Sequence, residues 1–322
     1  MKAIRVNQPG GSEVLSYEDI PTPTAGEGQL LVKLEAAGLN FLDTYQRSGL
    51  YKMDYPITMG NEGAGVVEAV GPGVSGFAAG ENVAYTGILG AYAEYALIPA
   101  ARAVKVPSGM TNKQGAAIML QGMTAHYLCR DTYRIESGDS CLIHAGAGGV
   151  GLLLIQMCKL LGAEVFTTVS TAEKAALAKG AGADHVINYT ETDFAEATLK
   201  ILGDRRLNVV YDAVAKDTFH KGLDLLKPRG MMVLYGQSSG PVPPIDLNIL
   251  NPKGSLYVTR PSLVHYIGSR AELDARASEV MGWVSSGKLD VRIGAEFALA
   301  EAKAAHDALE GRKTTGKVLL IP

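Results

Sequence analysis

Hydrophobic and polar residues alternate along much of the first 120 residues, which is the pattern of short strands that bury one face. In the segment QLLVKLEA, an apolar face formed by Leu30, Val32 and Leu34 alternates with Leu31, Lys33 and Glu35. The segments AGVVEAVGPGV and AYAEYALIPAARAVKVP are rich in β-forming residues and are interrupted by Gly and Pro. We therefore expect several strands joined by turns, with little helix beyond a turn near residues 41–47.

The middle of the chain follows a different pattern, in which short apolar runs alternate with helix-like segments. The runs are SCLIHA, AEVFTTV, DHVINY, LNVVYDAV, GMMVLYG and GSLYVT. Such an order predicts parallel strands with helical crossovers, in a sheet that is covered on both faces. Ser170-x-x-Glu173 and Ser269-x-x-Glu272 predict two helix starts, because a serine can cap a free backbone N–H while the glutamate reaches back.

After residue 262 the pattern predicts one long helix over about 270–286, a strand in VRIGAEFAL, a short helix and a last strand in GKVLLIP. This tail is too small to hold its own core, so we expect it to complete the first domain. A chain of 322 residues is long enough for two domains. The expected fold class is α/β, with a doubly wound parallel sheet and a second, β-rich domain.

Composition and charge exclude several classes of protein. Hydrophobic residues make up 47% of the chain, which favours folded cores over disorder. The formal net charge of −3 and the scattered charges are no reason to expect nucleic acid or a membrane as partner. The N-terminus lacks the apolar core of a signal peptide, and the apolar stretch 150–161 is too short to span a bilayer. Three widely spaced cysteines, Cys129, Cys141 and Cys158, predict reduced thiols in a soluble cytoplasmic protein.

The segment SCLIHAGAGGVGLLLI carries the spacing Gly146-x-Gly148-x-x-Gly151 between a predicted strand and an apolar helix. In a dinucleotide site Gly146 permits the tight turn, Gly148 lets the backbone approach a pyrophosphate, and Gly151 permits close packing of helix on strand. The helix start, with Gly149 and Val150, offers free N–H groups and the positive end of the helix dipole to phosphates. The alternative is a purely structural turn, but the strand and helix on either side favour a cofactor.

The end of the next predicted strand, in TTVSTAEK, indicates which nicotinamide cofactor is preferred. Proteins that bind NAD usually carry Asp or Glu there, to bind the ribose 2′-hydroxyl. This chain has Ser170 and Thr171, with Lys174 one helical turn further on. Hydroxyls, helix N–H groups and an ammonium favour a 2′-phosphate, which a carboxylate would repel. We therefore predict NADPH; the alternative for Lys174 is a solvated surface lysine.

Several motifs together resemble one protein family over essentially the whole chain. In order they are GLNFLDTYQRSGLY, GNEGAGVV, LQGMTAHYL, HAGAGGVG, VINY, YDAV and YVTRPSL, and they resemble the quinone oxidoreductases of the zeta-crystallin type. That group is a zinc-free branch of the medium-chain dehydrogenase/reductase superfamily. The resemblance implies a GroES-like β-rich catalytic domain from residues 1–121 and 263–322, a Rossmann NADPH-binding domain from 122–262, and an active site in the cleft. It also implies an oligomer, expected to be a homodimer.

The resemblance and the chemistry of the residues both predict that no metal is bound. Zinc-dependent relatives place a Cys and a His where Asn40 and Asn61 stand, and an amide is a poor zinc ligand. The early region has no set of four cysteines for a structural zinc. Glu62 remains a potential ligand, which we expect to form a structural hydrogen bond or an ion pair instead.

Without zinc, alcohol oxidation is poorly supported, because nothing else obvious would stabilise an alkoxide. Reduction of a quinone or an activated enone requires mainly orientation of the nicotinamide and hydrogen-bond donors to the developing oxyanion. The resemblance implies Asn40, Tyr45 and Tyr51 as these catalytic donors. The alternatives are a turn-capping amide and two half-buried core tyrosines.

The resemblance implies further contacts with the cofactor. Near the nicotinamide and the domain crossing these are Phe41, Leu42, Asp43, Gln121, Gly122 and Thr124. Tyr189 would lie beside the adenosine phosphate with Lys174, and Arg312 would reach back to the phosphates. The residues flanking the nicotinamide ribose would be Tyr235, Gly236, Gln237, Ser238, Arg260, Pro261 and Ser262. One departure from the relatives is Ala213, which has no hydroxyl to contribute.

These observations lead to one main hypothesis and two alternatives. The main hypothesis is an NADPH-dependent quinone reductase that transfers a hydride or single electrons from the cofactor to a quinone. The first alternative is an NADPH-dependent reductase of enone or alkenal double bonds, which would use the same fold and cofactor. The second is a non-enzymatic NADPH-binding structural or RNA-binding protein, although scattered lysines do not favour RNA.

Overall fold

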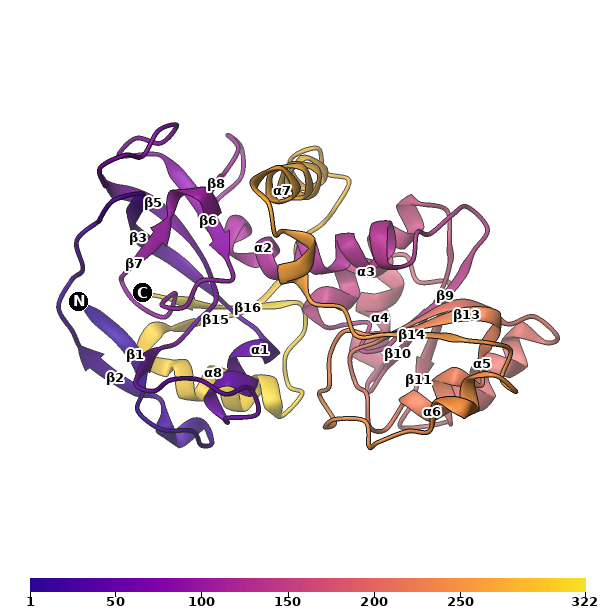
Figure 1. Ribbon diagram of the computed structural model, residues 1–322. Helices are drawn as coiled ribbons and strands as arrows, with labels where there is room; N and C mark the ends of the chain where they lie inside the picture. The colour runs from indigo at the N-terminus through magenta and orange to yellow at the C-terminus, as the bar shows by residue number, and fades with distance from the viewer. The chain divides into compact units, whose positions relative to one another are not determined.

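The chain forms two compact units, which the computed structural model describes over all residues 1–322 (Figure 1). Unit 1 contains Met1–Met123 and Ile267–Pro322, and unit 2 contains Thr124–Tyr266. Both ends of the chain therefore belong to unit 1. No helix in either unit is long and apolar enough to cross a membrane.

Unit 2 is built on a six-stranded parallel sheet with the strand order β11-β10-β9-β12-β13-β14. The first strand, β9, lies in the middle of the sheet. The chain adds β10 and β11 on one side, then returns to β12 on the other side and continues outward, so the order reverses between β9 and β12. This confirms the doubly wound sheet. The strands are β9 (Ser140–Ile143), β10 (Glu164–Val169), β11 (His185–Asn188), β12 (Leu207–Asp212), β13 (Leu226–Leu234) and β14 (Tyr257–Thr259).

Helices cover both faces of this sheet because its strands are apolar on both sides. On one face Leu142, Phe166 and Val210 pack with Phe194 and Phe219 of two crossover helices. The alternate positions along the same strands, such as Cys141 and Val209, are buried on the other face. The helices of unit 2 are α3 (Gly149–Leu160), α4 (Ala172–Gly180), α5 (Phe194–Leu202) and α6 (Phe219–Leu223), with a π-helical turn at Leu128–Thr132.

The three cysteines lie close together in unit 2, although they are widely spaced in the sequence. All three are free and buried, as expected. Burial raises the pKa of the Cys158 thiol well above its ordinary value, and hydrogen bonding with Cys129 and Cys141 raises it further. A buried, protonated thiol is a weak nucleophile, so this cluster acts as part of the core.

The two predicted helix starts have different outcomes. Ser269 caps α7 (Arg270–Ser285), and Glu272 reaches back to the Ser269 N–H, which confirms that prediction. The other prediction was wrong by one residue. Thr171, not Ser170, caps α4, because the Thr171 hydroxyl accepts from the Lys174 N–H at 3.2 Å. The Ser170 hydroxyl instead accepts from the Lys174 ammonium at 3.2 Å.

Unit 1 contains a seven-stranded and a three-stranded sheet. The larger sheet has the order β15-β16-β3-β5-β6-β8, with β7 also paired to β3, and the smaller sheet has the order β2-β1-β4. The C-terminal strands β15 and β16 therefore join the larger sheet, whose other strands lie within residues 29–105, because β16 pairs antiparallel with β3. The strands are β1 (Lys2–Val6), β2 (Ser16–Asp19), β3 (Gln29–Leu39), β4 (Ile57–Thr58), β5 (Glu62–Val70), β6 (Asn82–Thr86), β7 (Tyr95–Pro99), β8 (Val104–Lys105), β15 (Ile293–Ala298) and β16 (Lys317–Ile321).

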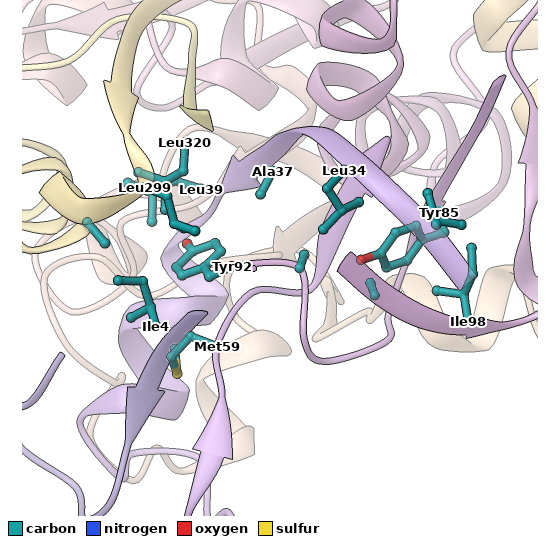
Figure 2. Close-up of a cluster of buried hydrophobic side chains, with 14 of the residues drawn as sticks. Ile4, Leu34, Ala37, Leu39, Met59, Tyr85, Tyr92, Ile98, Leu299 and Leu320 are labelled. Carbon is teal, nitrogen blue, oxygen red and sulfur yellow. The ribbon is translucent and has the colours of Figure 1, made fainter. Parts of the chain in front are cut away.

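The core of unit 1 combines side chains from both ends of the chain (Figure 2). Leu34 and Leu39 of β3 belong to the same buried cluster as Ile4, Tyr92 and Leu320. The helices that lie wholly within unit 1 are α1 (Phe41–Arg47), α7 and α8 (Ala302–Glu310). The tail after α7 thus completes the first core and forms none of its own.

Helix α2 (Asn112–Tyr127) was not expected, because the first 120 residues were predicted to hold little helix. It begins in unit 1 and ends in unit 2. Its start carries a reciprocal cap, in which the Thr111 hydroxyl accepts from the Gln114 N–H and the Gln114 side chain accepts from the Thr111 N–H. The spacing Thr-x-x-Gln is the sequence signal that could have identified this helix.

The buried guanidinium of Arg47 joins α1 to α8 in unit 1. Arg47 donates to His306 Nδ1 at 2.9 Å and forms two hydrogen bonds with the Glu310 carboxylate. Because a guanidinium only donates, His306 Nδ1 must be the acceptor and Nε2 must carry the proton. Burial and the positive charge of Arg47 lower the pKa of His306 to about 3.

We predict that His306→Gln makes the protein less sensitive to acid. In the unfolded chain this imidazole gains a proton near pH 6.5, whereas in the folded protein it does so only near pH 3. Its contribution to stability is therefore fully present above pH 6.5 and is lost as the pH falls toward 3. As the pH falls through that window, the unfolding free energy of the variant should rise relative to that of the parent by about 1.4 kcal/mol for each pH unit. Urea unfolding at several pH values measures this, with exposed His265→Gln as control; a constant difference between variant and parent would contradict it.

Candidate functional site

The carboxyl ends of the six strands of unit 2 meet at one edge of the sheet, because all six are parallel. Residues predicted to contact a cofactor follow five of these ends. The structure therefore brings together groups that are up to about a hundred residues apart. They are the glycine loop 146–151 after β9, Ser170 and Thr171 after β10, Tyr189 after β11, residues 235–238 after β13 and residues 260–262 after β14.

Two glycines of the loop after β9 are required by the fold itself. A Cβ atom on Gly146 would overlap the side chain of Thr167 in the neighbouring strand. A Cβ atom on Gly151 would overlap the backbone oxygen of Ala145, because α3 packs closely on the loop. The chain enters this turn through Ala145, which has a φ of 57°. Gly146 and Gly151 thus permit the turn and the approach of helix to strand.

Gly148 is different, because the fold does not need its lack of a side chain. A Cβ atom there would have a single neighbour within 4 Å, the Ala145 oxygen at 3.2 Å, and its φ of −76° suits any residue. Gly148 is the N-cap of α3, so the N–H groups of Gly149 and Val150 in the first turn have no acceptor within the helix. The bare backbone and the free N–H groups form a cradle for an anion.

The ends of β10 and β11 present hydroxyl groups and an ammonium. The Lys174 ammonium donates to the Ser170 hydroxyl at 3.2 Å. Tyr189 directly follows β11, and its N–H donates to the Val169 oxygen at the end of β10. The Tyr189 side chain is partly exposed. The strand end where NAD-binding proteins carry an acid thus has hydroxyls and a nearby positive charge.

The segment after β13 is held against the sheet by backbone hydrogen bonds, and the segment after β14 by a side-chain hydrogen bond. Tyr235 donates to the Asp212 oxygen at 2.9 Å, and Ser238 donates to the Ala213 oxygen at 3.0 Å. A Cβ on Gly236 would lie 2.7 Å from the Ala213 oxygen, so this glycine is needed for the close approach. The Arg260 guanidinium donates to the Leu234 oxygen at 3.2 Å, which ties the end of β14 to β13.

In unit 1 the side chain of Asn40 lies at the centre of a buried hydrogen-bond network. Its Nδ2 donates to the Gly38 oxygen at 3.2 Å and to Glu62 Oε2 at 2.9 Å. Its Oδ1 accepts from Lys317 Nζ at 3.0 Å and from Gln121 Nε2 at 3.2 Å. Both amide hydrogens of Asn40 are thus donated within the protein, so the expected role as donor to a substrate would require one of these bonds to break.

Glu62 and Lys317 form an ion pair whose side chains are 0% and 1% exposed. Glu62 Oε1 also accepts from the Leu120 N–H of α2 at 2.6 Å. The expectation that Glu62 makes a structural hydrogen bond or ion pair is confirmed. Lys317 was not identified from the sequence. The available signal was a single lysine at the start of the otherwise apolar segment KVLLI.

Asp43, which the resemblance places near the nicotinamide, is completely buried. Burial raises its pKa to about 6, and hydrogen bonds from Asn61, the Asn40 N–H and the Tyr92 hydroxyl partly offset that increase. Asp43 thereby joins α1 to Asn61, the residue before β5, and to Tyr92 of the core. Its role in the structure is to hold the helix that carries Phe41 and Tyr45.

The remaining predicted residues of unit 1 fall into two groups. Phe41, Tyr45 and Tyr51 form a row of rings, with centroids 6.3 Å apart for the first pair and 5.5 Å for the second, and all three are at least partly exposed. Gly122 is a packing residue, because a Cβ there would lie 2.9 Å from a methyl group of Val280 in α7. Arg312 is exposed and follows α8 with a φ of 58°.

No group of three or more His, Cys, Asp or Glu side chains is placed so that it could hold a metal ion. Asn61 donates to Asp43 Oδ1 at 2.7 Å and to Gln46 Oε1 at 2.5 Å. The amides of Asn40 and Asn61 therefore act as parts of hydrogen-bond networks.

Comparison with known proteins gives consistent matches along the chain. Residues 26–108 match the alcohol dehydrogenase GroES-like domain, and residues 149–286 match the zinc-binding dehydrogenase family. A quinone oxidoreductase of Pseudomonas aeruginosa is 45% identical, with 100% of this chain and 99% of the relative covered. A 2-haloacrylate reductase of a Burkholderia species is 42% identical, with 98% of each chain covered. The crystal structure of an Escherichia coli quinone oxidoreductase complexed with NADPH has a TM-score of 0.98 to this chain, at 44% identity, and 100% of both chains is covered.

We predict that alanine at Gly148 and alanine at Gly151 have unequal effects on stability. Gly151→Ala should lower the unfolding free energy by about 1–3 kcal/mol, because its methyl group would overlap the Ala145 oxygen. Gly148→Ala should lower it by less than about 1 kcal/mol, because only one atom lies nearby, at 3.2 Å. Denaturant unfolding without added ligand measures both. Equal losses would mean that Gly148 is also a packing glycine.

Proposed function

Because this chain belongs to the quinone oxidoreductases of the medium-chain dehydrogenase/reductase superfamily, we propose that it reduces a quinone with NADPH and without a bound metal. The observation that carries the proposal is the cradle at the start of α3, together with the hydroxyls and the ammonium at the end of β10. The match to a quinone oxidoreductase crystallised with NADPH supports the same assignment.

The residues present suit NADPH on two independent observations. Gly148 leaves open a place that a side chain would fill, next to the free N–H groups of α3, which suits a pyrophosphate. In unit 1 the Gln121 carbonyl oxygen is buried without a hydrogen-bond partner, which suits a donor group at the nicotinamide end. In this proposal Ser170, Lys174 and Tyr189 bind the 2′-phosphate, and the segments 235–238 and 260–262 line the nicotinamide ribose.

The residues of unit 1 orient the acceptor and bind its developing negative charge. When bound, NADPH supplies a hydride or single electrons to the acceptor. The hydroxyls of Tyr45 and Tyr51 are the proposed hydrogen-bond donors to the acceptor oxygen, and their rings with Phe41 form a surface for a flat molecule. Asn40 immediately precedes α1, and its amide is bound to Glu62 and Lys317. It thereby fixes the start of the helix that carries Phe41 and Tyr45.

A metal is not required for this chemistry, and the residues do not favour one. Amides occupy both positions where zinc-dependent relatives have a Cys and a His, and the Lys317 ammonium is bound directly to Glu62. A cation at Glu62 would have to displace that ammonium. We therefore propose that the electrostatic contribution near the acceptor comes from hydrogen bonds alone.

A second candidate function is reduction of an activated carbon–carbon double bond, such as that of an enone or alkenal. The specific support is the 42% identical relative that is named 2-haloacrylate reductase. Both reactions would use the same cofactor and the same donors, so substrate shape decides between them. A non-enzymatic role as an NADPH-binding structural protein requires only the cradle. Binding of RNA is less favoured, since the chain has a net charge of −3 and its lysines are scattered along the sequence.

We further propose a cytoplasmic homodimer. The three buried cysteines are unpaired, which is typical of a reducing compartment. At one edge of the parallel sheet, β14 lacks a neighbour on its outer side, and its first residue, Tyr257, is 57% exposed. A second copy could pair with this edge about a two-fold axis, which would cover the Tyr257 side chain and remove the open edge.

We predict that Lys174→Ala changes the preference between cofactors. Loss of a charge-assisted hydrogen bond to the 2′-phosphate should raise the Kd of NADPH by about 10- to 100-fold and leave that of NADH nearly unchanged. Fluorescence titration with both nucleotides measures this. Lys179→Ala, an exposed lysine on the same helix, is the control. An equal increase for both nucleotides would remove Lys174 from phosphate recognition.

Steady-state rates test the reaction itself. We expect NADPH-dependent turnover of 1,4-benzoquinone and 9,10-phenanthrenequinone that exceeds turnover of a simple enone. Dialysis against a chelator should leave the rate unchanged, because no step uses a metal. Turnover of the enone alone would favour the second function. NADPH binding without turnover of any acceptor would favour the structural role.

A charged substitution at the open edge tests the dimer. Tyr257→Glu should convert the dimer to a monomer in analytical ultracentrifugation, because a charge on β14 disfavours its burial. Leu160→Glu, an equally drastic change at another exposed apolar residue, should leave the mass unchanged. A parent protein that sediments as a monomer would overturn this part of the proposal.

A further inference from the structure

The side-chain carbonyl oxygen of Gln121 is buried and has no hydrogen-bond partner within the chain. Its amide nitrogen, in contrast, donates to Asn40 Oδ1 at 3.2 Å. Buried polar atoms are nearly always paired, because an unpaired one keeps the cost of desolvation without a compensating bond. Two points therefore need an explanation: why the Gln121 amide nitrogen faces Asn40, and which donor outside the chain binds the Gln121 carbonyl oxygen.

The cause can be followed through Asn40 to Lys317. An ammonium group only donates hydrogen bonds, so Asn40 must turn its Oδ1 toward Lys317 Nζ, at 3.0 Å. The Nδ2 of Asn40 then faces the acceptors Glu62 Oε2 and the Gly38 oxygen. Since Oδ1 also faces Gln121, that residue must present its amide nitrogen, which leaves its carbonyl oxygen without a partner.

The fold provides space for this ammonium. A Cβ atom on Gly38 would lie 2.6 Å from Lys317 Nζ, so only glycine at this position of β3 admits the lysine. Glu62 is held by a second bond from the Leu120 N–H, which is the neighbour of Gln121 on α2. Groups from β3, β5, α2 and β16 thus meet at one buried charge pair, next to the start of α1.

We propose that Lys317 is a positioning residue for the nicotinamide end of NADPH. It acts through Asn40 to turn the Gln121 carbonyl toward a donor of the cofactor, either an N–H of the nicotinamide carboxamide or a hydroxyl of the attached ribose. Lys317 itself touches neither substrate nor cofactor. This inference rests on the proposed function, since it assumes that NADPH is the ligand.

The test uses two variants and a control. Lys317→Met removes the ammonium but leaves Glu62 as an unpaired buried charge, which can unfold the protein. The double variant Glu62→Gln with Lys317→Met is neutral and avoids that problem. In it the new amide accepts from the Leu120 N–H and donates to Asn40. Asn40 then reverses, at the expense of its bond to the Gly38 oxygen, and Gln121 reverses with it, so that an N–H₂ group faces the cofactor. Lys33→Met removes an exposed lysine from the same sheet and is the control.

Binding is measured with NADPH, with 2′-phospho-ADP-ribose and with 2′-phospho-ADP, by calorimetry. We expect the double variant to bind NADPH about tenfold more weakly, the effect of one lost hydrogen bond, and to bind 2′-phospho-ADP as the parent does. A loss confined to NADPH identifies the carboxamide as the donor. A loss shared with 2′-phospho-ADP-ribose identifies the ribose hydroxyl.

Two outcomes would overturn the inference. Unchanged NADPH affinity in the double variant means that Lys317 does not direct Gln121. An equal loss for all three ligands means that the ion pair only supports the fold. Failure of the parent protein to bind NADPH would instead overturn the proposed function, and the inference with it. Lys33→Met should match the parent with every ligand.

Discussion

The buried ion pair between Lys317 and Glu62 is the interaction on which the site in unit 1 depends. Two charges removed from water cost several kcal/mol each, and only good geometry and additional hydrogen bonds offset that cost. Here Asn40 and the Leu120 N–H provide those bonds, so the charges are fully paired. Because an ammonium only donates and a carboxylate only accepts, the pair also imposes a direction on every amide that touches it.

A different constraint organises unit 2, where geometry and not charge decides which residues meet. Parallel strands end on one side, so loops that are distant in sequence gather at the edge where the strand order reverses. Within the first loop, Gly146 and Gly151 are needed for packing, whereas Gly148 is not. Gly146 and Gly151 therefore serve the fold, whereas Gly148 leaves space for a ligand. The sequence does not distinguish these roles, because they depend on the atoms that surround each glycine.

Local patterns predicted the elements that depend on neighbours in sequence. The alternation in QLLVKLEA predicted β3, the apolar runs predicted the six parallel strands, and Ser269-x-x-Glu272 predicted the start of α7. The prediction was wrong where two adjacent residues compete for one role. Ser170 and Thr171 can both cap α4, and the bond between Ser170 and the Lys174 side chain leaves the cap to Thr171. The start of α2 was missed although Thr111 and Gln114 carry the capping signal.

The sequence by itself determined the two-domain α/β class, the glycine loop and the absence of an acid after β10, because each is a property of a few consecutive residues. Only the tertiary structure decided that Asp43 is buried, that three distant cysteines share one core, and that Lys317 lies against Glu62 and Asn40. Burial and the direction of a hydrogen bond depend on partners from other strands. Lys317 is 277 residues from Asn40, and no local pattern indicates that the two side chains meet.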